Sequence, residues 1–93
     1  MARKVDWADC AWNDLSKIAD YIALDSRHYA AAFVSEVSDA ADSLQHFAER
    51  GRKVPEFSDS SIRELLIRNY RLIYKIKSSQ VLVLTFIHGA TRL

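Results

Sequence analysis

Apolar residues recur at three- and four-residue intervals through the first half of the chain, a pattern typical of amphipathic helices. Asp9 is expected to cap the first helix or to lie in its first turn. The sequence LDSR then separates two apolar stripes, and Asp25 or Ser26 is placed to cap the second helix. Because this connection is short, we expect the two helices to pack as an antiparallel hairpin. The first stripe consists of Ala8, Ala11, Trp12, Leu15, Ile18, Ala19 and Ile22, and the second of Ala30, Phe33, Val37, Ala40, Leu44 and Phe47.

Period-two alternation replaces the helical spacing in the second half of the chain. It marks three segments rich in branched, aliphatic and aromatic residues, which predict three consecutive β-strands. The connections Arg68–Asn69 and Ser78–Gln80 are about the length of hairpin loops, and Asn69 tolerates a positive φ. Neighbouring strands are therefore expected to be antiparallel. The predicted strands are 62–68, 70–77 and 81–88.

A further short strand is predicted in Arg3–Trp7, where Val5 and Trp7 share one side of a period-two pattern. Gly51 and Pro55 predict an irregular connection between the helices and the three strands. Helices followed by strands define an α+β fold in which the helices cover one face of the sheet. We thus expect a short N-terminal strand, an antiparallel two-helix hairpin and a mainly antiparallel sheet of three consecutive strands.

A two-residue turn at Arg68–Asn69 fixes which side chains share a face of the predicted sheet. One face is assigned to the helices. The other carries Arg71, Ile73 and Lys75 and is expected to be open to another molecule. Glu64 is expected within ion-pair reach of both Arg71 and Lys75. The opposed pairs are Ile67 with Tyr70, Leu65 with Leu72 and Arg63 with Tyr74 on the helix face, and Leu66 with Arg71 and Glu64 with Ile73 on the other.

The last predicted strand is apolar on both faces. A sheet covered on one side only carries polar residues on the other. Either this strand is central and shielded by its neighbours, or something outside the domain covers it. The alternation places Val81, Val83 and Ile87 on one face and Leu82, Leu84 and Phe86 on the other.

Length and composition fit one soluble domain spanning residues 1–93, with 49% hydrophobic and 27% charged residues. The single cysteine, Cys10, has no internal disulfide partner, which suits a reducing compartment. No secretory segment and no run of membrane-spanning length is visible, so we expect a cytoplasmic protein that does not enter the membrane. Cys10 and three scattered histidines show no ligand spacing, so we expect no metal site and no cofactor.

The net charge of +1 hides two halves of opposite sign. Residues 1–49 carry four Lys or Arg and nine Asp or Glu, a net charge of −5. Residues 50–93 carry nine basic and three acidic residues, a net charge of +6. This split is either incidental or a basic surface for an acidic partner, such as nucleic acid, a nucleoprotein or an acidic protein segment.

Four stretches resemble, in this order and over nearly the whole chain, the RelE/ParE superfamily of bacterial toxins from type II toxin–antitoxin systems. They are IADYIALDS, SLQHFAERGRKVPEF, IRELLIRNYRLIYKI and FIHGATRL. The resemblance implies a short strand, a helical hairpin and an antiparallel sheet, the order that the pattern predicts. It also implies a cognate antitoxin, encoded nearby, whose C-terminal segment wraps the toxin in a hetero-oligomer.

Members of the superfamily have one of two activities. RelE-like members are ribosome-dependent endoribonucleases that cut mRNA, whereas ParE-like members poison DNA gyrase without an established hydrolytic step. Arg71, in YRLIY, matches the arginine that nuclease members place near the scissile phosphate, but ParE-like members also have it. The lysine pair of the nucleases falls on Ile62 and Glu64, and their C-terminal tyrosine has no counterpart. The segments GRKVPE and HGATRL are more similar to the ParE branch.

The expected function is therefore that of a toxin that binds and poisons DNA gyrase, inhibits growth, contributes to plasmid stabilisation and is neutralised by its antitoxin. The alternatives are a RelE-like mRNA endoribonuclease and a non-toxic member that still binds antitoxin. A nuclease would use Arg71, His88, Arg92 and Glu64 as base, acid and charge-stabilising groups. The residues expected to bind the target or the antitoxin are Arg63, Arg71, Ile73, Lys75, His88 and Arg92.

Overall fold

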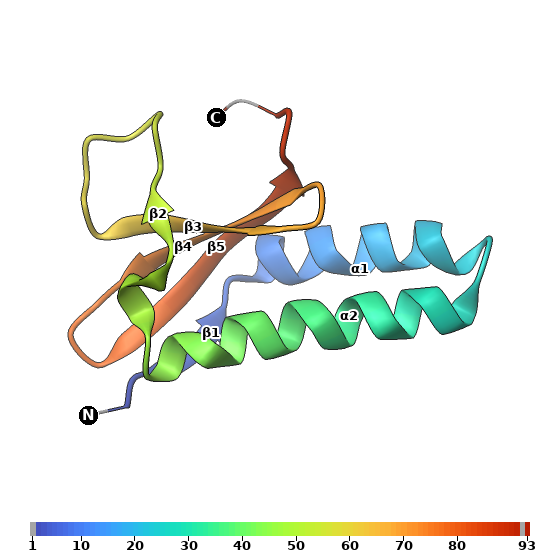
Figure 1. The fold of residues 1–93 in the computed structure, drawn as a ribbon, viewed down its shortest axis with the longest axis horizontal. Coiled ribbons are helices and arrows are strands. Elements are labelled where there is room, and N and C mark those ends of the chain that lie inside the picture. Colours follow the sequence, from blue (N-terminus) through green and yellow to red (C-terminus); the bar gives the residue numbers. More distant parts are fainter. Residues whose placement is uncertain (1, 92) are drawn as a thin grey trace.

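The computed structural model describes residues 2–91 and 93 and shows a helical hairpin packed on one face of a sheet (Figure 1). Helices α1 (Asp9–Ala23) and α2 (Arg27–Asp42) run antiparallel, as predicted. Ser26 is the N-cap of α2, because its Oγ accepts a hydrogen bond from the Tyr29 N–H at 3.1 Å. The N-cap of α1 is Ala8, so Asp9 is the first-turn acid rather than the cap.

The sheet has five strands in the order β1-β5-β4-β3-β2. The three consecutive antiparallel strands predicted from the sequence are confirmed as β3, β4 and β5. Strand β1 pairs in parallel with β5, so the sheet is mixed. A two-residue edge strand, β2, lies inside the segment predicted to be irregular. The strands are β1 (Lys4–Trp7), β2 (Arg52–Lys53), β3 (Ile62–Ile67), β4 (Tyr70–Ile76) and β5 (Gln80–His88).

The register between β3 and β4 is the one expected from a two-residue turn. Leu65 lies opposite Leu72, Leu66 opposite Arg71 and Glu64 opposite Ile73. The turn residue with positive φ is Arg68, at 54°, rather than Asn69. The predicted division of side chains between the two faces of this hairpin is therefore confirmed.

The core lies between the hairpin and the inner face of the sheet. Tyr74 is fully buried there, and its hydroxyl donates to the Ala48 carbonyl at 2.6 Å and accepts from the Gly51 N–H at 3.0 Å. The assignment of two residues to the apolar stripes is wrong, because both are exposed: Trp12 is 51% exposed and Phe47 66% exposed. Helix α2 ends at Asp42 and gives way to 3₁₀ turns, so helical spacing no longer determines where Phe47 points.

A β-bulge changes which side chains of β5 share a face. Ile73 pairs with Thr85 while the next residue, Tyr74, pairs with Val83, so Leu84 is the extra residue. The bulge reverses the alternation, and Phe86 joins Val83 in the core. The expected placement of Phe86 on the opposite face was therefore wrong. Strand β5 is internal to the sheet, as the first of the two explanations required.

Beyond Val83, no strand of residues 2–91 and 93 pairs with β5 on the β1 side, because the pairing with β1 ends at Trp7. Helix α1 supplies partners instead. The Asp14 carboxylate accepts from the Thr85 hydroxyl at 2.9 Å and from the Phe86 N–H at 3.4 Å. These bonds hold α1 against β5. The C-terminal end of β5 leads directly into the last residues of the chain.

Candidate functional site

The outer face of β4 is covered by the chain itself. Arg71 is 5% exposed and Ile73 only 1% exposed. The cover consists of residues 54–61, called the covering loop, and residues 89–91 and 93, called the C-terminal tail; both lie on the side of the sheet away from the helices (Figure 1). The expectation that Arg71 and Ile73 lie on an open face is therefore wrong, because the connection between β2 and β3 folds back over them.

Arg71 holds these two segments together. Its Nη1 and Nη2 donate to the two carboxylate oxygens of Glu56 at 2.9 and 2.8 Å, a bidentate pair. The same Nη1 donates to the Thr91 carbonyl at 2.9 Å. The Leu93 N–H adds a bond to Glu56 at 3.3 Å. One guanidinium thus ties the covering loop and the C-terminal tail to the middle of the sheet.

Glu64 binds the Nε edge of the Arg71 guanidinium. Its side chain is 0% exposed and accepts from the Arg71 Nε at 2.6 Å and from the Arg52 Nε at 2.5 Å. A buried carboxylate is tolerated only when it is paired in this way. The predicted ion pair with Arg71 is confirmed. Two guanidinium groups and two carboxylates therefore form a cluster with no net charge, hereafter the Arg71 cluster (Arg52, Glu56, Glu64 and Arg71).

The ionisation of the cluster follows from these contacts. Hydrogen bonds from the Arg71 guanidinium lower the pKa of Glu56 to about 2 from its ordinary value of 4.5, and the Leu93 N–H acts in the same direction. The bond to Glu56 in turn raises the pKa of Arg71. Glu56 is therefore ionised throughout the physiological range.

Arg63, expected to bind a partner, is engaged within the chain. Its Nε donates to the Ser60 carbonyl at 2.9 Å, and its Nη1 donates to the carbonyls of Gly51 at 3.2 Å and Glu49 at 3.4 Å. These bonds tie β3 to both ends of residues 49–60, the segment that precedes it. Arg63 thus has a structural role in this geometry.

Lys75 lies at the other end of β4 from His88. Its Nζ is 3.8 Å from the Asp59 carboxylate, and its side chain is 41% exposed. The expected ion pair between Lys75 and Glu64 is wrong, because the two Glu64 oxygens are engaged by Arg52 and Arg71 and Lys75 pairs with Asp59. Lys75 is therefore open to solvent at the edge of the covering loop.

His88 is exposed at the end of β5, opposite Tyr70 in the register. Its Nδ1 accepts from the Ala90 N–H at 3.1 Å, and its ring meets Tyr70 edge-on with centroids 5.7 Å apart. His88 and Arg71 both line a hollow of about 390 Å³, beside the exposed Arg68. The structure thus brings these two predicted residues together, whereas predicted Arg92 lies outside the described residues.

Sequence reasoning missed two partners of Arg71, Glu56 and the Thr91 carbonyl, and it missed Arg52, which shares Glu64 with Arg71. They line a second hollow of about 250 Å³ together with Arg71 and Pro55. Glu56 follows Pro55 in a loop that also contains Asp59, so the sequence around Glu56 has no distinctive signal of the pairing. A carbonyl contact carries no sequence signal.

Four of the five N–H donors of the Arg71 guanidinium bond to acceptors within the chain, and its side chain is 6% exposed. Within residues 2–91 and 93, no three His, Cys, Asp or Glu side chains are grouped to hold a metal ion. None of the helices in that part of the chain has the length and apolar character to cross a membrane.

Two solved structures that share this fold come from toxin–antitoxin systems. A chain from the chromosomal ParDE TA system from P. aeruginosa superposes with a TM-score of 0.76, covering 94% of this chain and 96% of its own, at 21% identity. A chain from the toxin-antitoxin complex RelBE2 from Mycobacterium tuberculosis gives a TM-score of 0.67, covering 98% and 95%, at 22% identity. Likeness at such low identity shows that this chain has the ParE/RelE toxin fold.

The family is shown by sequence. The family model described as ParE toxin of type II toxin-antitoxin system, parDE, matches residues 5–93. The chain therefore belongs to the family of ParE toxins of type II toxin–antitoxin systems. Comparison with curated proteins gives no match.

Proposed function

We propose that this toxin inhibits growth by binding DNA gyrase and does not hydrolyse RNA. The observation that carries the proposal is the state of Arg71. The arginine that the nuclease branch places near a phosphate is 5% exposed here and bonded to Glu56 and Glu64. A protein-binding toxin does not need this group to be free.

The rest of the Arg71 cluster also supports binding over cleavage. Phosphodiester cleavage requires positive charge directed at the developing charge of the transition state. Here the two positions of the nuclease lysine pair hold Ile62 and Glu64. The Glu64 side chain is 0% exposed and accepts from two arginines, so it is not available to an incoming hydroxyl as a general base.

We further propose a cognate antitoxin as the silencing partner, in a hetero-oligomer in the cytoplasm. Both solved neighbours come from toxin–antitoxin systems, which supports such a pairing. In the proposed binding set, His88 is exposed at the end of β5, and the Lys75 side chain is 41% exposed near the far end of β4. Arg71 and Ile73 become accessible when the covering loop and tail are displaced, and Arg63 and Arg92 complete the set.

The test is a supercoiling assay with purified gyrase, run beside an mRNA cleavage assay in a translating extract. The proposal predicts that the toxin lowers supercoiling in proportion to its concentration, that the antitoxin restores it, and that mRNA stays intact. Cut mRNA together with unaffected supercoiling would establish the endoribonuclease alternative instead. If neither activity appears while the antitoxin still binds, the chain is a non-toxic member of the family.

The antitoxin proposal has its own measurement. The product of the neighbouring gene should co-purify with the toxin and raise its melting temperature, because a ligand of the native state stabilises it by mass action. At a free concentration one hundred times Kd this amounts to about 2.7 kcal/mol. An unchanged melting temperature at saturating partner would contradict the pairing.

A further inference from the structure

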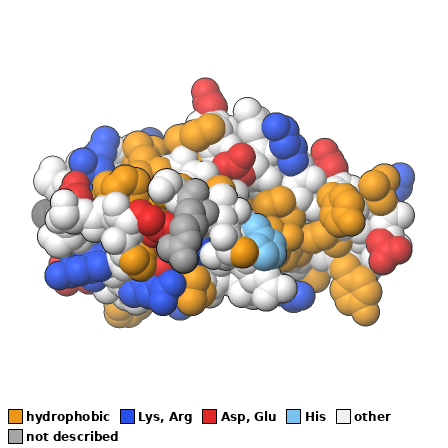
Figure 2. Space-filling view, turned by 90° about the horizontal axis from the view of Figure 1, so that it is seen from above, with side chains coloured by type: hydrophobic (Ala, Val, Ile, Leu, Met, Phe, Trp, Pro, Cys, Tyr) orange, Lys and Arg blue, Asp and Glu red, His pale blue; other side chains and the backbone are white. Residues whose placement is uncertain are grey.

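The turn of the helical hairpin exposes three large side chains. Tyr21 is 76% exposed, Leu24 85% and Tyr29 69%. All three lie within residues 21–29, called the hairpin tip, at the end of the molecule away from the N-terminus and β2 (Figure 1). In Figure 2, hydrophobic side chains are prominent over the half of the surface that includes this end of the molecule. Exposed aromatic side chains gathered at one place mark an interaction surface.

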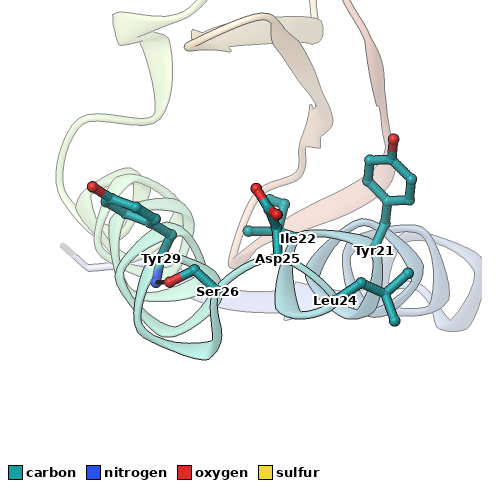
Figure 3. Close-up of a pocket in the computed structure, with 6 residues that line it drawn as sticks. All are labelled: Tyr21, Ile22, Leu24, Asp25, Ser26 and Tyr29. Atoms are coloured by element: carbon teal, nitrogen blue, oxygen red, sulfur yellow. Dashed lines mark hydrogen bonds between the residues drawn. The ribbon is translucent and has the colours of Figure 1, made fainter.

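The hairpin tip is hollowed. A cleft of about 510 Å³ is lined by Tyr21, Ile22, Leu24, Asp25, Ser26 and Tyr29. In Figure 3 the two tyrosine rings rise on either side of the Asp25 carboxylate, which stands beside Ile22 between the two helices. The Ser26 hydroxyl is occupied by the Tyr29 N–H. The cleft therefore offers two aromatic walls and one central anionic group.

The charges around the cleft favour a cation. Within residues 2–91 and 93, no Lys, Arg or His nitrogen lies within 4.0 Å of the Asp25 carboxylate. The last turn of α1 contains no basic residue to offset the negative end of its dipole. Residues 21–29 contain one acid, Asp25, and one cation, Arg27, which is not among the residues that line the cleft. Asp25 is thus the one charged residue in the lining of the cleft, and the lining is net negative.

From this arrangement we propose that the hairpin tip is a docking surface for a basic segment of a partner protein, and that its cleft receives an arginine side chain. A guanidinium stacks on tyrosine rings and pairs with a carboxylate at the same time. Leu24 and Ile22 provide apolar contact for the residues that flank the arginine. The surface lies on the two helices, away from the Arg71 cluster, and its occupant does not depend on whether gyrase is the target.

The direct probe is the peptide acetyl-Gly-Leu-Arg-Leu-Gly-amide, with the citrulline peptide as its neutral isostere. Titration of the ¹⁵N-labelled toxin should shift the amide signals of residues 21–29. The citrulline peptide, and the variant Asp25→Asn, should each bind about tenfold more weakly, since the aromatic and ionic contacts are lost in part. Equal binding of both peptides, or shifts confined to other elements, would overturn the proposal.

The partner is then identified with the double variant Tyr21→Ala/Tyr29→Ala. Phe47→Ala is the matched control, since it removes an equally exposed aromatic side chain from outside the tip. The double variant should bind the purified antitoxin or purified gyrase about tenfold more weakly, while the control binds as the wild type does. Unchanged affinity for both partners would refute the docking role. Self-association of the wild type that the double variant abolishes would instead assign the tip to a second copy of this chain and overturn the proposal.

Discussion

Replacing Arg71 with alanine tests whether the outer face of β4 is built as described. The change removes the common partner of Glu56, Glu64 and the Thr91 carbonyl. Glu56 is partly open to solvent and can be rehydrated. Glu64 cannot, because its side chain is 0% exposed and keeps only the bond from Arg52. The variant therefore leaves the buried Glu64 carboxylate with only one of its two arginine partners.

Removing one partner of a buried ion pair costs about 3–5 kcal/mol. The remaining bond from Arg52 places the expected loss at the lower end, about 3 kcal/mol. For a domain of this size, each 1 kcal/mol lowers the melting temperature by about 4–8 °C, so the loss corresponds to roughly 12–24 °C. Substitution on an open face would cost no more than about 0.5 kcal/mol.

The assay is urea unfolding followed by circular dichroism, with the double variant Arg71→Ala/Glu64→Gln completing a mutant cycle. Because glutamine removes the stranded charge, the double variant should be more stable than Arg71→Ala alone. A loss below about 1 kcal/mol in Arg71→Ala, with no recovery in the double variant, would refute the buried cluster. It would restore the interpretation of Arg71 as an open binding residue.

Three further predictions concern other parts of the chain. Because the pKa of Glu56 is lowered to about 2, its contribution to stability is full above about pH 4.5 and is lost as the pH falls through 2; the Leu93 amide signal should report this release, and Glu56→Gln should abolish the transition. Gly51→Ala should cost about 1–3 kcal/mol in urea unfolding, because the added Cβ meets the Tyr74 hydroxyl and lies 2.7 Å from the Glu64 carbonyl oxygen. Ser26→Ala should cost about 1 kcal/mol by loss of the cap.

Each of these has a result that contradicts it. A Leu93 signal that titrates with a midpoint near pH 4.5 would show that Glu56 is not held by Arg71. Wild-type stability in Gly51→Ala would mean that this segment packs differently against Tyr74. For the cap, Ser35→Ala is the control, being an exposed serine in the interior of α2; equal effects of the two substitutions would remove the capping argument.

The sequence was informative where structure is local. Hydrophobic spacing predicts both helices, and the two-residue turn at Arg68–Asn69 fixes the register between β3 and β4. The Arg71–Glu64 pair follows directly from that register. The sequence was not informative at Leu84, because the bulge there reverses the alternation of side chains between the two faces of β5 and is marked by no distinctive residue.

The cover over Arg71 depends on contacts between residues distant along the chain. Glu56 reaches Arg71 across a loop, and the Thr91 carbonyl reaches it from the terminus. Such contacts leave no periodic pattern, so a cationic residue on an apolar strand suggested an external partner. The acid that follows Pro55 supplies that partner from within. The sequence predicted the pairing of Arg71 with Glu64 and missed the second carboxylate, Glu56.

Gyrase binding is the central claim, and direct binding tests it most closely. Gyrase immobilised on a sensor surface should retain the purified toxin at concentrations that inhibit supercoiling, and prior addition of the antitoxin should change that binding. The ribosome, immobilised in the same way, should not retain the toxin at those concentrations. Retention by the ribosome with none by gyrase would contradict the account.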